Sequence, residues 1–177
     1  MKLPIAYYGN PILRKKGKPV KAFDESLKKL VEDMIETMES SDGVGIAAQQ
    51  IHKALLLFIT KAPSYDEEKN DWVEGEIRIF VNAKIIKKSP EVWDFDEGCL
   101  SIPKVYDKVP RHWTITLAYQ DIEGNSHVEE FTGYPARVVQ HEFDHTQGIL
   151  FVDRVLGKAR QALEPKLKEI KQKYSKS

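Results

Sequence analysis

The sequence predicts an α+β fold in which antiparallel or mixed sheets pack around a central helix, with a further helix at the C-terminus. Two observations support this class. Some segments show the apolar spacing of helices and others the composition of strands. These segments do not alternate regularly along the chain, which argues against a doubly wound parallel sheet. With 177 residues, 41% of them apolar and 31% charged, the chain can bury one core. We expect a single domain spanning 1–177.

The N-terminal third is expected to hold an irregular stretch, a helix and a glycine-rich loop. The first twenty residues contain Pro4, Pro11 and Pro19 and should be irregular. Asp24 can then cap a helix that ends near Ser40. Its apolar residues recur at helical spacing: Leu27, Leu30, Val31, Met34, Ile35 and Met38. A glycine-rich loop is expected over 42–50.

The middle of the chain has the character of strands. We expect strands over 55–60, 77–87, 113–120 and 126–132. The segment 121–125 should form a hairpin turn between the last two, and the polar segment 61–75 a surface loop. A second helix should begin at Thr132 or Gly133 and end near Gln147, with Gly148 as its C-cap. A third helix is expected over 157–173, interrupted or kinked near Pro165.

Composition excludes several function classes. Lysine plus arginine equals aspartate plus glutamate, at 27 each, so global charge favours no nucleic-acid partner. The longest apolar run, 54–59, is too short to cross a membrane. No targeting segment is visible at the N-terminus. The single cysteine, Cys99, fits a reducing compartment and leaves a free thiol, so we expect a cytoplasmic protein.

The strongest local signal is His141-Glu-Phe-Asp-His145. Residues four apart lie on one face of a helix, so the two imidazoles can bind one metal ion. The glutamate that follows the first histidine can reach a water on that metal. The bland interpretation, two helical histidines without a ligand, stays open from this pattern alone.

A catalytic metal usually has three protein ligands and one open position. The third ligand could come from either side of the two histidines. Downstream, Glu164 and Glu169 lie in a lysine-rich helix, and no further histidine follows. Upstream, Cys99 follows Gly98, which allows the backbone to turn closely around an ion. Taken alone, Cys99 fits a small buried apolar residue at least as well.

Three segments together resemble the signature motifs of the peptide deformylases. They are Gly43-Val-Gly-Ile-Ala-Ala-Gln-Gln50, Glu97-Gly-Cys-Leu-Ser101 and Gln140-His-Glu-Phe-Asp-His145. The similarity extends to Val109-Pro-Arg111 and covers essentially the whole chain. Gln49 and Thr146 depart from the usual residues and bear on the shape of the pocket. The helical C-terminus is similar to that of enzymes from Gram-negative bacteria and organelles, so the chain could also be a mature organellar form.

The resemblance implies a hydrolase that removes the formyl group from the N-terminal formylmethionine of nascent polypeptides. It implies Cys99, His141 and His145 as ligands of one metal, Fe²⁺ in the cell with Zn²⁺, Ni²⁺ or Co²⁺ as substitutes. Glu142 would transfer the proton. The side-chain amide of Gln50 and the backbone N–H of Leu100 would stabilise the charge that develops on the formyl oxygen. Gln140, Asp144 and Glu97 are candidates for orienting the ligands.

The resemblance also implies a substrate site and a partner. The loop around Gly43 would pair with the peptide as an added strand. The methionine pocket would be shaped by Val44, Gly45, Phe95, Tyr134, Arg137 and Val138. The basic segment 157–177, which includes Lys176, would contact the ribosome, although a solvated helix is the commoner meaning of such a charge run. We expect a monomer.

Three alternatives remain from the sequence. A zincin-like endoprotease would need a third ligand downstream and would cleave unformylated peptides. A cysteine hydrolase with Cys99 as nucleophile would keep its activity after metal removal. A deformylase-like binding protein would hold metal or peptide without turnover.

Overall fold

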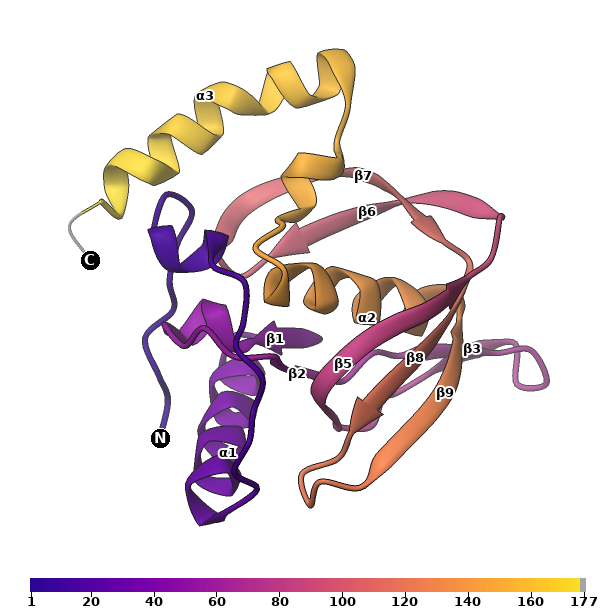
Figure 1. Ribbon diagram of the computed structural model, residues 1–177. Coiled ribbons are helices and arrows are strands. Elements are labelled where there is room, and N and C mark those ends of the chain that lie inside the picture. Colours follow the sequence, from indigo (N-terminus) through magenta and orange to yellow (C-terminus); the bar gives the residue numbers. More distant parts are fainter. Residues whose placement is uncertain (176–177) are drawn as a thin grey trace.

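A five-stranded antiparallel sheet is the largest element of the computed structural model, which describes residues 1–175 (Figure 1). Its strand order is β1-β2-β5-β8-β9. The strands are β1 (Gly45–Ala47), β2 (Leu57–Thr60), β5 (Arg78–Lys88), β8 (Thr114–Gln120) and β9 (Ser126–Thr132). The four strands expected from composition are therefore present. β1 lies within the expected glycine-rich loop and forms one edge of the sheet, followed by a 3₁₀ turn (Ala48–Ile51).

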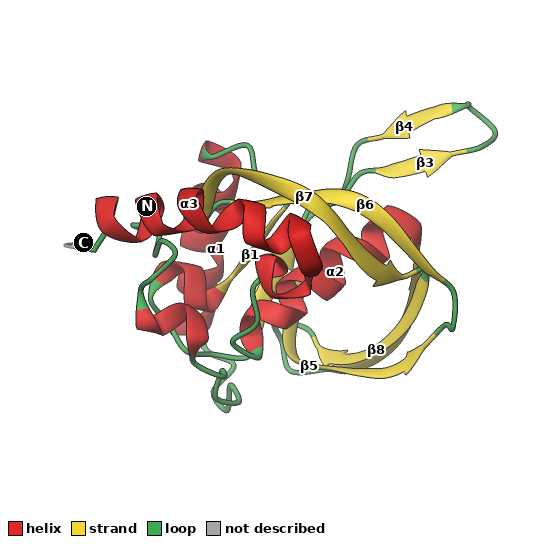
Figure 2. Cartoon of the chain, turned by 90° about the horizontal axis from the view of Figure 1, so that it is seen from above, coloured by secondary structure: helices red, strands yellow, loops and turns green. Residues whose placement is uncertain are grey.

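Two further hairpins were not predicted from the sequence. β6 (Val92–Cys99) and β7 (Ile102–His112) form a separate antiparallel pair. β3 (Ser64–Asp66) and β4 (Asp71–Val73) form a short pair that stands out from the rest of the molecule (Figure 2). The expectation of a plain surface loop over 61–75 was therefore wrong. An antiparallel pairing with Tyr65 opposite Trp72 orders that segment.

The first helix, α1 (Glu25–Ser40), forms where it was expected. The side chain of Asp24 accepts a hydrogen bond from the Leu27 N–H at 3.0 Å, which satisfies one of the unpaired donors at the helix start. Its buried residues, among them Leu27, Val31 and Met38, pack with Ile46 of β1 in one hydrophobic cluster. α1 therefore supports the edge strand from one side.

The central helix, α2 (Gly133–Thr146), lies between the five-stranded sheet and the β6–β7 hairpin (Figures 1 and 2). Thr132 is its N-cap, and Pro135 falls in the first turn, where a missing N–H costs little. Gly148 follows the helix with a φ of 77°, the left-handed conformation that glycine adopts easily. Most of this helix is buried, polar residues included.

The C-terminal helix, α3 (Gly157–Lys173), is continuous through Pro165. The expected interruption is therefore absent. Leu163, Leu167 and Ile170 are buried and pack with Ile102, Val105 and the segment 150–155. Their spacing of four and three residues places them on one side, and the lysines lie on the exposed side. Short 3₁₀ turns at Pro11–Arg14 and Phe151–Arg154 complete the described elements. Within residues 1–175, no helix has the length and apolar character that a membrane span requires.

Candidate active site

The polar face of α2 is unusually buried. His141, Glu142 and His145 are each less than a tenth exposed, in a helix that packs on both sides. Burying so many ionisable groups costs free energy unless each has a partner. The two histidines lie one helical turn apart, with ring centroids 5.2 Å from each other. Both rings therefore lie side by side on one face of α2.

Cys99 completes a group of three possible metal ligands. It ends β6, and its Sγ lies 3.4 Å from Nε2 of His145. One donor atom from each of Cys99, His141 and His145 lies within 4.8 Å of the others. A sulfur and two imidazole nitrogens at this separation suit one tetrahedral metal ion with a position left over.

The ring of His141 is oriented as metal binding requires. Nδ1 of His141 pairs with Oε1 of Glu97 at 2.8 Å, so its Nε2 is left to face the site. Nδ1 of His145 has no hydrogen-bond partner within residues 1–175, although it is buried. The donor set and its orientation therefore fit one divalent transition metal.

Glu97 belongs to a buried charge network behind the histidines. Burial alone would raise the pKa of Glu97, but hydrogen bonds from Arg111 and His141 lower it well below the usual range. Arg111 donates to Glu97 at 2.9 Å and to Asp144 at 2.5 Å. Arg154 also holds Asp144, at 2.6 and 2.9 Å. Glu97 is therefore held as a carboxylate that can orient His141.

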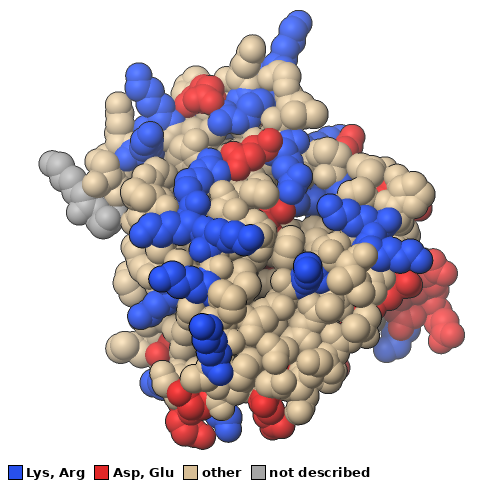
Figure 3. Space-filling view, in the orientation of Figure 1, with Lys and Arg blue, Asp and Glu red and all other residues tan. Residues whose placement is uncertain are grey.

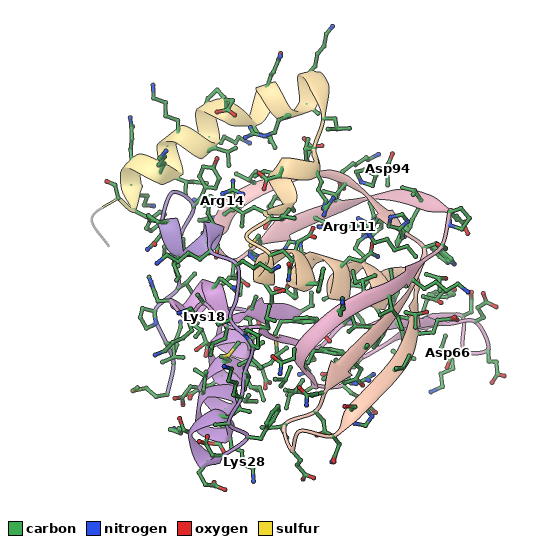
Figure 4. All side chains as sticks on the ribbon, viewed as in Figure 1. Arg14, Lys18, Lys28, Asp66, Asp94 and Arg111 are labelled. Atoms are coloured by element: carbon green, nitrogen blue, oxygen red, sulfur yellow. The ribbon has the colours of Figure 1, made fainter. Side chains whose placement is uncertain are left out.

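The three residues that the sequence suggested for orienting the ligands make different contacts in the structure. Glu97 touches a histidine directly, whereas Asp144 acts on Glu97 through Arg111, which lies beside α2 in Figure 4. Gln140 instead bonds the backbone of His112 and Ala136. Arg154 was not anticipated, and Arg111 was noticed only as part of a similar segment.

The carboxylate of Glu142 lies beside His141, with one of its two oxygens left without a hydrogen bond in the described chain. Its Oε1 is buried and has no hydrogen bond within the described chain, and its Oε2 lies 4.0 Å from Nε2 of His141. Burial raises the pKa of Glu142 to about 7. A Cβ on Gly45 would overlap this carboxylate, lying 2.8 Å from its carbon. Only glycine therefore allows β1 to pass so close to Glu142.

Gln50 is aimed at the site by its own backbone neighbourhood. Its Oε1 accepts a hydrogen bond from the Ala47 N–H at 2.9 Å, which fixes the orientation of the amide. Its NH₂ then faces Ser101 Oγ at 3.1 Å and Cys99 Sγ at 3.5 Å. A neutral donor is thereby held beside the proposed ligands, with the side chain almost fully buried.

A cavity of about 420 Å³ opens in front of these groups. Among the residues proposed for catalysis and substrate binding, these line it: Gly43, Val44, Gly45, Gln50, Leu100, Tyr134, Arg137, Val138 and Glu142. Phe95 lies outside the lining, with its ring 5.8 Å from that of Tyr134. The guanidinium of Arg137 donates hydrogen bonds to Glu97, Val109 O and Trp93 O.

The structure also adds residues that the sequence did not single out. Ser101 reaches Gln50, and Asp42, Asp96 and Tyr106 line the cavity mouth. No spacing rule reveals them, because they come from segments far apart in the chain. Only the position of Ser101 at the end of the segment around Cys99 could have indicated a role.

An α+β fold built around a buried HExxH helix, with a cysteine as the third donor, is typical of a metal-dependent hydrolase. Comparison with known proteins then specifies the family. The sequence profile of the polypeptide deformylase family matches residues 2–161. The peptide deformylase of Christiangramia forsetii is 40% identical over 176 residues, covering 96% of this chain and 90% of that protein. That of Pseudothermotoga lettingae is 42% identical over 166 residues, covering 94% and 90%.

Solved structures agree with the sequence comparison. The peptide deformylase from Thermus thermophilus superposes with a TM-score of 0.86 and 38% identity, covering 98% of this chain and 99% of that one. A peptide deformylase from Plasmodium falciparum superposes with a TM-score of 0.87 and 34% identity, covering 97% of this chain and 96% of that one. This chain belongs to the polypeptide deformylase family. It is a hydrolase that removes the N-formyl group from nascent polypeptides.

Proposed function

We propose that the chain carries out this deformylation with one metal ion held by Cys99, His141 and His145. The observation that supports the proposal most strongly is the convergence of their three donor atoms beside the carboxylate of Glu142, whose buried Oε1 has no hydrogen-bond partner within residues 1–175. Cys99, His141 and Glu142 line a cavity large enough for a methionyl residue. We further propose that residues 1–177 form a single catalytic domain.

The metal is proposed to be Fe²⁺ in the cell, with Zn²⁺, Ni²⁺ or Co²⁺ as substitutes. One thiolate and two imidazoles suit all of these ions, so the ligands alone do not choose among them. The bound ion supplies Lewis acidity and brings a water close to neutral pKa. Oxygen sensitivity would follow for the iron form, since the thiolate of Cys99 can also be oxidised.

Glu142 is proposed to transfer the proton. Its carboxylate faces the cavity with a pKa raised to about 7 by burial, which matches a group that must accept and release a proton near neutral pH. It would take a proton from the attacking water and deliver it to the amine that leaves as formate forms. Gly45 keeps the space that this carboxylate occupies.

Gln50 and Leu100 are proposed to stabilise the oxygen of the formyl group. Negative charge develops there when the carbonyl carbon is attacked, and donors already in place lower the barrier. The Gln50 amide is fixed by Ala47, so it need not reorganise during the reaction. The backbone N–H of Leu100 would be the second donor, next to Cys99 in the cavity wall.

The substrate is proposed to lie along the free edge of the five-stranded sheet. β1 is an edge strand, so one side of its backbone is available to pair with an extended peptide. Gly43, Val44 and Gly45 would make these contacts. Tyr134, Val138 and the aliphatic part of Arg137 would receive the methionine side chain, with Phe95 beyond Tyr134.

The test is release of formate from formyl-Met-Ala by anaerobically purified, iron-loaded protein. Acetyl-Met-Ala serves as the matched control substrate, since it differs by one methyl group. We expect formate release, little acetate release, and loss of activity on chelation that Fe²⁺ restores. Activity that survives complete metal removal would instead support a cysteine hydrolase. Cleavage of unformylated peptides would support an endoprotease. Absence of any activity in folded, metal-loaded protein would support a binding function.

The exposed face of α3 is proposed to contact the ribosome. Lys158, Lys166 and Lys168 are exposed there, and the upper part of Figure 3 shows cationic side chains over this region. Lys176 of the predicted basic segment lies outside the described residues. Phosphate-rich rRNA would attract such a face. We also propose a monomer in the cytoplasm of a bacterium, with a mature organellar form as the alternative.

Charge reversal tests ribosome contact better than deletion, because deletion of α3 would expose the core that Leu163 and Leu167 cover. The variant carries Lys158→Glu, Lys166→Glu and Lys168→Glu. Its matched control carries Lys84→Glu, Lys87→Glu and Lys88→Glu, which reverse three lysines of β5. We expect ribosome co-sedimentation to weaken only in the α3 variant. Equal binding by both variants would contradict the proposal.

A further inference from the structure

The β3–β4 hairpin places two aromatic rings in solvent beside the active-site cavity. Tyr65 and Trp72 are 48% and 53% exposed, and their rings meet edge to face at 5.7 Å. A two-stranded hairpin this short is only marginally stable alone, so contacts with the body must hold it. At its base, the Lys61 N–H donates to Val44 O at 2.7 Å. In β4, the ring of Trp72 packs against that of Tyr134, with the two ring centroids 5.9 Å apart.

Both anchors are cavity residues, which makes the hairpin part of the cavity rim. Val44 and Tyr134 line the cavity that the substrate is proposed to fill. Beyond Tyr134, the ring of Phe95 lies at 5.8 Å and is itself 42% exposed. Trp72, Tyr134 and Phe95 therefore form a continuous, partly exposed aromatic rim. Isolated exposed aromatics need no explanation, but a contiguous group next to a binding cavity indicates an interaction surface.

The charge of this region is strongly negative. Residues 62–76 carry one lysine, Lys69, against a larger acidic set: Asp66, Glu67, Glu68, Asp71, Glu74 and Glu76. Asp42 and Asp96 line the cavity mouth nearby. Within residues 1–175, the one ion pair that these eight acids make is Glu74 with Lys61, at 3.7 Å. The acidic cluster is visible at the right edge of Figure 3, where Figure 4 labels Asp66.

We propose that this aromatic rim binds the residues that follow formylmethionine in the substrate and favours lysine or arginine there, with Trp72 as the specificity-determining residue. The proposal rests on the deformylase function. The ring centroids of Tyr134 and Trp72 lie 5.9 Å apart, about the length of two extended residues, so side chains that follow the methionine would come within reach of Trp72. A cation over an indole ring gains from the ring quadrupole, and tryptophan is the best aromatic partner for it. The surrounding carboxylates attract the same side chains.

The test compares three substrates on metal-loaded enzyme: formyl-Met-Ala, formyl-Met-Ala-Lys-Lys and formyl-Met-Ala-Glu-Glu. We expect kcat/KM for the lysine peptide to exceed that for the glutamate peptide by about tenfold at low salt. The difference should lie mainly in KM and shrink at high salt, because the charges are exposed. Equal values for the two long peptides would overturn the proposal.

Two variants separate binding from support of the cavity. Trp72→Ala should lower the ratio of kcat/KM between the lysine peptide and formyl-Met-Ala by about threefold. Glu67→Lys with Glu68→Lys should reverse the preference, whereas the matched control Glu123→Lys with Glu130→Lys should not change it. If Trp72→Ala lowers kcat/KM equally for all three substrates, Trp72 merely supports Tyr134 and the proposal fails. A parent enzyme silent on formyl-Met-Ala would contradict the deformylase function itself, and this proposal with it.

Discussion

At the scale of single residues, the site depends on how closely β1 approaches α2. The backbone at Gly45 passes so near the Glu142 carboxylate that no side chain fits between them. The same segment orients Gln50, whose carbonyl oxygen is held by Ala47. One short stretch of chain therefore positions both the proton-transfer group and a donor for the formyl oxygen.

Gly45→Ala should lower kcat/KM for formyl-Met-Ala by about a hundredfold. The new methyl group would overlap the Glu142 carboxylate and push it out of the position from which it transfers the proton. Metal content should stay at one ion per chain, since no proposed ligand touches Gly45. Formate release at the parental rate would show that the close approach has no catalytic role.

Asp144→Ala should weaken metal retention, although the hydrogen bonds of the Asp144 side chain go to Arg111 and Arg154 and not to a proposed ligand. Without it, Arg111 loses one of its two carboxylate partners, and the hold of Glu97 on His141 loosens. Partners that orient ligands typically contribute about 10- to 100-fold in metal affinity. Titration with a competing chelator measures the change. An affinity equal to that of the parent would remove Asp144 from the set of orienting residues.

The sequence could predict the residues of the site better than their surroundings. Cys99, His141 and His145 could be named because short motifs keep them together or carry a family resemblance, and the structure brings them within reach of one ion. Arg154 could not be named from the sequence, because its contact with Asp144 depends on how the segment after α2 folds back. The order of Tyr134 and Phe95 could not be predicted either, since a motif does not reveal which aromatic ring lies nearer the cavity.

At the scale of elements, predictability followed the strength of the local pattern. α1 and α2 have caps and helical spacing and were predicted closely. β6 and β7 were missed because prolines, aspartates and lysines break the alternation that marks a half-buried strand. α3 continues through Pro165, at a typical cost of about 3 kcal/mol. Burial of Leu163, Leu167 and Ile170 against the core offsets that cost.

The pairing of Arg14 with Asp153 connects the N-terminal 3₁₀ turn to the one after α2, at 2.5 Å. Burial would raise the pKa of Asp153, but hydrogen bonds from Arg14 and the Leu150 N–H lower it overall. A depressed pKa contributes stability that is full above the unfolded value, about 3.9, and is lost as pH falls through the folded value.

Asp153→Asn should therefore lower the melting temperature at pH 7 and have progressively less effect as the pH falls below about 4. Thermal unfolding of parent and variant across that range measures the difference. Asp107→Asn, at a position of β7 without an ion pair in the described chain, is the matched control. A destabilisation that does not change with pH would contradict the role of the charge.

At the scale of the whole molecule, the proposed ligands join two separate parts of the fold. Cys99 comes from the β6–β7 hairpin, and both histidines come from α2, which packs on the five-stranded sheet. An ion bound by all three would connect the hairpin to that sheet. Metal binding should therefore stabilise the entire fold as well as enable catalysis.

Adding metal at about 100 times its dissociation constant should raise the free energy of unfolding by about 2.7 kcal/mol, provided that the unfolded chain does not bind it. The melting temperature in metal and in chelator, measured by calorimetry under anaerobic conditions, checks this. His145→Ala should abolish most of the difference. An equal melting temperature in metal and in chelator would argue that the three donor atoms hold no ion.

The central claim is that Glu142 transfers the proton at a metal held by Cys99, His141 and His145. The most direct measurement is formate release from formyl-Met-Ala by Glu142→Gln, which keeps the size of the side chain but cannot accept the proton. We predict a loss of at least about a hundredfold in kcat with the metal content unchanged. Parental activity in a metal-loaded Glu142→Gln enzyme would contradict the account.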